Sequence, residues 1–156
     1  MRSISLVLLM ALPAVAHAQA LPKGATPLSA AEINAMFAGK TYSFQEKGQD
    51  GKMKPIAWYL GEGGKMLGYT GNGPSYAEGT WSASDGKLCV SNHWEGSWGT
   101  SQSNDCQAWA HDKGKSQTVY RAETSKGGNY AKFSPKLSDG DTISQKIDAL
   151  KAKLKK

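Results

Sequence analysis

Two cysteines and two histidines are the residues of this chain that could most clearly bind a metal ion or form a covalent bond. Cys89 and Cys106 are the only cysteines, and His93 and His111 follow them by four and five residues. Two thiolates and two imidazoles could form a tetrahedral zinc site, but this spacing matches no standard zinc pattern. In an exported protein, which the N-terminus indicates, an even cysteine pair is typical of a disulfide. We therefore predict a Cys89–Cys106 disulfide worth roughly 3 kcal/mol, no metal site and no cofactor.

A second group of chemically able residues follows Cys89, in a polar segment that we expect to form a loop. It combines two aromatic rings with an imidazole, an amide and a carboxylate: Asn92, His93, Trp94, Glu95 and Trp98. Exposed aromatic rings beside polar groups suit the apolar faces of sugars or a protein partner. We therefore predict a ligand-binding surface here. The alternative is that one or both tryptophans fold back and cover an end of the molecule.

The same segment holds residue types that could support catalysis, but no motif fixes their geometry. Ser97, His93 and Asp105 could supply a nucleophilic triad, although no nucleophile elbow places them. His93 and Glu95 could act as base and acid in a hydrolase or lyase of envelope polymer. The chain has no dinucleotide fingerprint, phosphate loop or calcium loop. We predict a non-enzymatic module without catalytic residues that binds a small apolar ligand, a glycan or an envelope protein, with the hydrolase or lyase as the alternative.

The N-terminus is typical of a secretory leader. Arg2 provides a basic start, residues 4–15 are apolar, and Ala16 and Ala18 precede a cleavage site after residue 18, or alternatively after residue 20. No later stretch approaches the roughly 20 apolar residues that a transmembrane helix needs. We therefore predict a periplasmic or secreted protein without a transmembrane segment.

The elements that must position these residues are mainly strands. From residue 40 to residue 134, short alternating runs are separated by turns rich in glycine, of which the chain has 18. About seven or eight strands in this length predict antiparallel hairpins, and closure removes their exposed edges. We predict one mainly β domain over residues 19–142, an up-and-down barrel or strongly curled sheet of lipocalin-like type. Three tryptophans in the strand pattern are expected in its core: Trp58, Trp81 and Trp109.

A short helix is expected before the first strand, over residues 29–38. Ser29 and Glu32 fit a capping box, in which each side chain satisfies a free backbone N–H of the other, and Gly39 is placed to end the helix. An apolar stripe then packs on the sheet or across the mouth of a barrel: Ile33, Met36 and Phe37.

A basic helix is expected at the C-terminus, over residues 142–156. Asp141 could cap it, as could a Thr142–Gln145 capping box. The segment from residue 143 onward carries a net charge of +4, out of +6 for the whole chain. These lysines could form a solvated face, make weak contact with an anionic surface, or anchor a structural envelope protein; we predict no nucleic-acid partner. An apolar stripe docks on the sheet or pairs with a partner: Ile143, Ile147, Leu150 and Leu154.

Five short motifs lie within roughly residues 28–133. They are Leu28-Ser29-x-x-Glu32-Ile33, Gly39-Lys40-Thr41, Gly79-Thr80-Trp81, Asp85-Gly86-Lys87-Leu88-Cys89-Val90 and Cys106-x-x-Trp109. These motifs resemble those of the small exported bacterial proteins catalogued as domain of unknown function 995. The resemblance implies a bacterial periplasmic setting and brings no activity with it. The chain departs from the family pattern in its long tryptophan-bearing segment between the cysteines and in its basic C-terminal helix.

Overall fold

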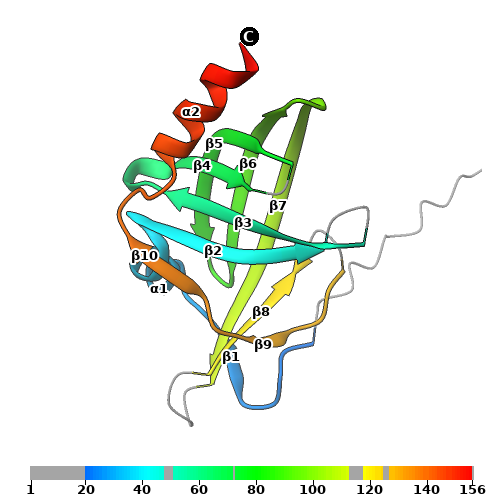
Figure 1. Cartoon of the computed structure of the whole chain (residues 1–156). Helices are drawn as coiled ribbons and strands as arrows, with labels where there is room; N and C mark the ends of the chain where they lie inside the picture. The colour runs from blue at the N-terminus through cyan, green and yellow to red at the C-terminus, as the bar shows by residue number, and fades with distance from the viewer. Residues whose placement is uncertain (1–19, 48–50, 72, 113–117, 125–126, 156) are drawn as a thin grey trace, which may run out of the picture.

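The protein is a strongly curled antiparallel sheet with a helix at one end and a second helix on its outer face (Figure 1). The computed structural model describes residues 20–47, 51–71, 73–112, 118–124 and 127–155. The predicted leader, residues 1–18, lies outside these ranges. The strands are β1 (Ala25–Pro27), β2 (Lys40–Lys47), β3 (Met53–Leu60), β4 (Lys65–Thr70), β5 (Ser75–Ser84), β6 (Lys87–Gly96), β7 (Gly99–Asp112), β8 (Val119–Glu123), β9 (Ala131–Phe133) and β10 (Lys136–Asp139), and the helices are α1 (Ala30–Phe37), η1 (Glu62–Gly64) and α2 (Ser144–Leu154).

The sheet is a meander whose two end strands are consecutive in the chain. Its hydrogen-bonded order is β10-β2-β3-β4-β5-β6-β7-β8-β9, and β1 pairs with β7. Only Ser134 and Pro135 separate β9 from β10, so residues 131–139 pair first with β8 and then with β2. The prediction of a mainly β, strongly curled antiparallel sheet is therefore confirmed.

Helix α1 closes one end of this half-barrel, where the β3–β4 and β5–β6 turns also lie. The predicted capping box is present: Ser29 Oγ accepts a hydrogen bond from the backbone N–H of Glu32, and Glu32 Oε2 accepts one from the backbone N–H of Ser29. Gly39 follows with φ 71°, a left-handed conformation that favours glycine. Ile33 and Phe37 are fully buried against the sheet.

A single large core fills the closed end. Phe37 meets Trp109 and Tyr42 with ring centroids 4.9 and 5.3 Å apart, both in edge-on contacts. The three tryptophans predicted to be internal are all buried in it, which confirms that prediction. The buried members of the cluster are Leu28, Ile33, Phe37, Tyr42, Phe44, Trp58, Leu60, Met66, Trp81, Leu88, Val90 and Trp109.

Helix α2 docks on the outer face of the sheet through its apolar stripe, as one of the two predictions for it required. Asp141 caps it, because its Oδ1 accepts hydrogen bonds from the backbone N–H groups of Ile143 and Ser144. The predicted Thr142–Gln145 capping box is wrong, since the backbone N–H of Thr142 donates to Thr41 on β2 instead. The buried cluster beneath the helix contains Leu67, Tyr76, Ile143, Ile147 and Leu150.

The polar segment expected as a loop is a β-hairpin, which corrects that prediction. β6 and β7 pair through Gly96 and Gly99, leaving only Ser97 and Trp98 as the turn. Gly99 has φ 114° there, a conformation that side chains rarely adopt. The hairpin lacks a strand-like pattern because residues 99–104 of β7 are exposed on both faces, apart from the half-buried Ser103, so neither face needs an apolar sequence there.

Candidate functional site

The inner face of the β6–β7 hairpin continues from the core toward the open end of the half-barrel. Leu88 and Val90 belong to the core, and alternation along β6 places Asn92 and Trp94 on the same face. His93 and Glu95 consequently point to the outer face. The five predicted ligand-binding residues are therefore divided between two faces and do not form one site.

The open end contains a cavity of ≈ 290 Å³. It draws side chains from β2 to β7, so strands distant in sequence contribute to a single hollow. Its lining combines two indole rings with hydroxyl groups, two carboxylates and one ammonium group: Glu46, Lys54, Ile56, Trp58, Thr70, Ser75, Trp94, Ser103 and Asp105.

Trp94 forms an inner wall of this cavity because two small residues leave room for its ring. It lies opposite Ala77 in the β5–β6 register, and Gly68 lies opposite Ala77 in the β4–β5 register. A Cβ added at Gly68 would lie 3.1 Å from the indole Cη2 of Trp94 and 3.0 Å from the Ala77 Cβ. The indole therefore extends across β5 to β4, and a side chain at residue 68 would press against its far edge.

Trp98 lies at the rim of the same open end. A Cβ added at Gly96 would lie 2.7 Å from Trp98 Nε1 and 3.0 Å from the Cβ of Ser75, a cavity residue. The ring of Trp98 therefore folds over Gly96 on the inner side of the hairpin while remaining 55% exposed. Of the two predicted tryptophans, one lines the cavity and the other stands beside its entrance.

The wall of the cavity includes a buried hydrogen-bond donor that has no partner. Trp58 is only 3% exposed, and its indole Nε1 makes no hydrogen bond in the structure. Asn92, on the same inner face, also has an unpartnered side-chain nitrogen. Ser103 Oγ lies 2.9 Å from both Asn92 Oδ1 and Asp105 Oδ2, which fixes these acceptors. The core residue Trp109 also has an indole Nε1 without a partner, so an unused N–H is not by itself the mark of a ligand site.

An arginine that the sequence analysis missed holds the inner face together below the cavity. Arg121 donates hydrogen bonds to the hydroxyl of Tyr42 at 2.7 Å and to Glu123 at 3.1 Å, and its guanidinium lies 4.0 Å from the ring centroid of Phe133. Burial raises the pKa of Tyr42 above its ordinary value, and the nearby Arg121 opposes that shift. The sequence gives no signal for this position, because alternation along β8 puts Arg121 on the same face as Glu123, opposite Tyr120 and Ala122.

On the outer face, Glu95 accepts a hydrogen bond from Tyr76 and forms no acid–base pair with His93. The hydroxyl of Tyr76 donates to Glu95 Oε2 at 2.6 Å, and this hydrogen bond raises the pKa of Tyr76 to about 12. His93 is exposed and pairs across the strands with Glu78 and Gln102. Asp105 lines the inner cavity, so the residues of the possible triad lie on opposite faces of the sheet.

The cysteines form the predicted disulfide, and the alternative zinc site is thereby ruled out. Cys89 and Cys106 are directly opposite each other on β6 and β7, with Cα atoms 4.1 Å apart. The bond lies on the outer face, away from the cavity. Within the described ranges, no group of three or more His, Cys, Asp or Glu side chains could hold a metal ion.

Comparison with known proteins gives a family and nothing more specific. A family model described as "Protein of unknown function (DUF995)" matches residues 5–148. Neither the curated proteins nor the solved structures contain a match to the chain. No helix in the described part of the chain is long and apolar enough to cross a membrane.

Proposed function

The chain belongs to the DUF995 family, whose function is unknown, and we propose from its geometry that it is a non-enzymatic binding module. The ligand that fits best is a small molecule with a flat apolar face and several oxygen atoms, such as a saccharide. It would enter the open end of the half-barrel and contact Trp94, Trp58 and the polar groups around them. The cavity of ≈ 290 Å³ is at the lower end of the usual range for small-ligand sites, which suits one or two sugar rings.

The indole of Trp94 carries this proposal. It gives the wall of the cavity an aromatic face, which extends across Ala77 to Gly68. Trp58 adds a second indole ring to the same lining. Carbohydrate rings stack on aromatic side chains through their C–H faces, while their hydroxyl groups need donors and acceptors at the edge. Ser103 and Asp105 are placed to provide them.

We also propose that the protein works outside the cytoplasm, in the periplasm or as a secreted protein. The leader-like pattern of residues 1–18 and the Cys89–Cys106 disulfide support this location, because disulfides persist in oxidising compartments. A cell-envelope glycan would then be the class of ligand within reach.

Calorimetric titration with a panel of trisaccharides tests the binding proposal. The panel contains the trimers of N-acetylglucosamine, glucose in β-1,4 linkage and glucose in α-1,4 linkage. We expect at least one of them to bind, and the Trp94→Ala variant to bind it at least about tenfold more weakly, because buried aromatic anchors typically contribute 1.4 kcal/mol or more. Amide chemical-shift changes should map to the inner face.

The matched control is His93→Ala, which changes the adjacent residue but faces outward. It should bind the same trisaccharide with unchanged affinity. Equal binding by wild type and Trp94→Ala would refute the cavity as the site. An envelope-polymer hydrolase activity that His93→Ala or Glu95→Ala abolished, with the fold intact by circular dichroism, would replace the binding module with the enzyme alternative.

A further inference from the structure

A second hollow lies on the outer face of the sheet and is larger than the cavity at the open end. Its volume is ≈ 610 Å³. It lies over β2, β3 and β4, between helix α2 and the crossing segment that joins β9 to β10. The inner cavity opens on the other side of these strands, so a ligand here would be separate from the proposed saccharide.

The strand register explains why this face is hollow. One row of outward residues runs directly across four strands, from Lys136 on β10 through Ser43 and Ala57 to Tyr69 on β4. The two central members are small, whereas the two end members are long. Neighbouring strands are about 4.8 Å apart, so the row forms a trough with a lysine at one end and an aromatic ring at the other.

Helix α2 forms one wall of this outer groove, and the chain segment that precedes β10 forms the other. Helix α2 packs on β4 and β5, and its Lys146 places its ammonium group 5.9 Å from the ring centroid of Tyr69. On the opposite side, the β10–β2 ladder ends at the Lys136–Ser43 pair because the next residue, Pro135, has no N–H to donate. The chain then leaves β2, and Phe133 and Ser134 complete that side.

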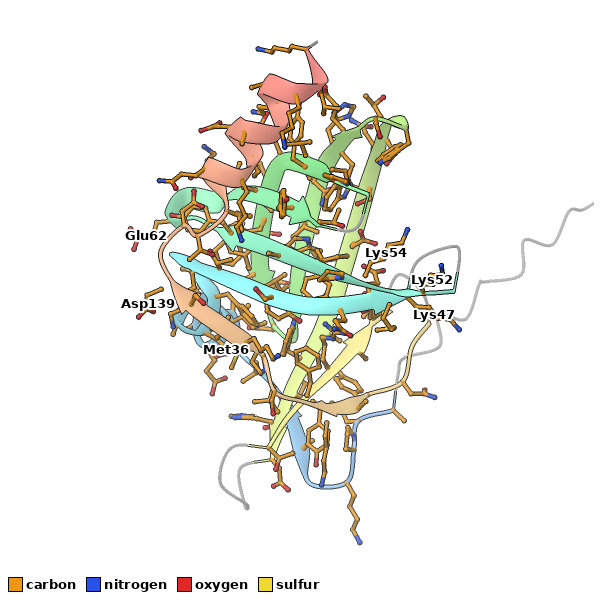
Figure 2. The ribbon with its side chains drawn as sticks, in the orientation of Figure 1. Met36, Lys47, Lys52, Lys54, Glu62 and Asp139 are labelled. Atoms are coloured by element: carbon orange, nitrogen blue, oxygen red, sulfur yellow. A yellow bond between two sulfur atoms is a disulfide. The ribbon has the colours of Figure 1, made fainter. Side chains whose placement is uncertain are left out.

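The described residues that line the groove carry a net positive charge. Among them are Lys136 and Lys146 but no acidic side chain. Neither ammonium group pairs with a carboxylate within the described ranges, unlike Lys151 of the same helix, which lies 2.6 Å from Glu78. Figure 2 shows that the acidic residues Glu62 and Asp139 lie at the closed end of the sheet, whereas Lys47 extends from the far end of β2.

We propose that this outer groove binds one molecule of an anionic amphiphile, a short apolar body that carries a phosphate or carboxylate group. The head group would lie at one side of the trough, beside Lys136 or Lys146, and the apolar body would cover the floor around Ala57 and Pro55 between them. Ammonium groups suit phosphate and carboxylate as point charges. A walled trough encloses a single molecule, whereas a flat membrane surface would touch only its rims, so the occupant is a dissolved molecule rather than a bilayer.

Calorimetric titration with octyl phosphate tests the proposal, with octanoate, octyl glucoside and inorganic phosphate as comparison probes. We expect octyl phosphate and octanoate to bind, octyl glucoside to bind at least about fivefold more weakly, and inorganic phosphate not to bind measurably. Lys136→Gln and Lys146→Gln should each weaken octyl phosphate about threefold to fivefold, which is the usual size of a partly exposed charge interaction. Ser43→Leu should weaken the binding of octyl phosphate, because its larger side chain would stand in the middle of the trough.

Two variants serve as matched controls. Lys153→Gln removes an exposed lysine from the same helix without touching the groove, and it should leave octyl phosphate binding unchanged. Trp94→Ala alters the inner cavity and should also leave it unchanged. Octyl glucoside binding as tightly as octyl phosphate would overturn the charge argument. Two results would contradict the proposal that the groove is the binding site. One is unchanged octyl phosphate binding by Ser43→Leu; the other is sedimentation of the protein with phosphatidylglycerol vesicles without any binding of octyl phosphate.

Discussion

The closed and open ends of the half-barrel are built from the same strands but filled in opposite ways. At the closed end, Phe37 and Trp109 are fully buried and pack ring against ring. At the open end, Glu46, Lys54 and Asp105 share the inner face with Trp94 and line a cavity. The difference separates stability from recognition, because apolar packing lowers the free energy of the fold, whereas polar and charged side chains around a cavity offer donors and acceptors to a ligand.

The largest expected effect on stability comes from removing one aromatic ring at each end of the half-barrel. Phe37→Ala should lower the free energy of unfolding by about 3 to 5 kcal/mol, because it leaves a cavity in a close-packed core. Trp94→Ala should cost roughly 1 kcal/mol, since its ring is only partly buried at a solvent-facing wall. Urea-induced unfolding monitored by circular dichroism measures both values. Similar losses for the two variants would show that the open end is as much a part of the core as the closed end.

The disulfide should contribute next most to stability, without affecting the open end. It links β6 to β7 over a sequence separation of 17, which corresponds to about 3 kcal/mol in the loop-entropy model. Reduction should therefore shift the urea midpoint downward, and a Cys89→Ser, Cys106→Ser double variant should unfold at the same midpoint with or without reductant. Because the bond lies on the outer face, trisaccharide affinity measured below the unfolding transition should not change on reduction. A loss of trisaccharide affinity on reduction would show that the disulfide and the cavity at the open end are coupled.

The closed end is easier to predict from the sequence than the open end, because its contacts join residues that are closer together along the chain. The capping box of Ser29 and Glu32 is a contact between residues three apart, so its pattern is visible in the chain. Of the two caps predicted for α2, the local one at Asp141 is present. The Thr142–Gln145 box is not, because Thr142 is held by Thr41, which lies 101 residues away and becomes a neighbour only when β2 pairs with β10.

The candidate site was predicted only in part for a related reason. Trp94 and Asn92 were recognised as unusual, but a polar hairpin with both faces near solvent has no apolar alternation to distinguish it from a loop. Trp58 is correctly predicted to lie in the core, yet nothing in the sequence shows that it also lines a cavity with Trp94. The outer groove depends on the register that aligns Ser43 with Ala57, and strand pairing is a long-range property that the pattern of residues leaves open.

The smallest expected effect concerns the Tyr76–Glu95 pair, which tests whether the outer face is independent of the inner cavity. The hydrogen bond to Glu95 raises the pKa of Tyr76 to about 12, above its ordinary value of about 10. The folded state thus holds this proton more tightly than the unfolded state. The stability that the pair provides is therefore fully present below about pH 10 and is lost as the pH rises through about 12.

Glu95→Gln should lower the pKa of Tyr76 toward its ordinary value, because the negatively charged acceptor is removed. Alkaline titration of tyrosinate absorbance measures it, with the Tyr76→Phe curve subtracted to isolate this one phenol among the six tyrosines. An unchanged midpoint in Glu95→Gln would show that the carboxylate is not the cause. Trisaccharide binding at neutral pH should be the same in Glu95→Gln and wild type, since Glu95 and Trp94 are neighbours in sequence whose side chains occupy opposite faces of β6. If the affinity for the trisaccharide fell, the two faces of β6 would be coupled through the hairpin backbone. The outer face could then not be treated as scaffold that is independent of the cavity.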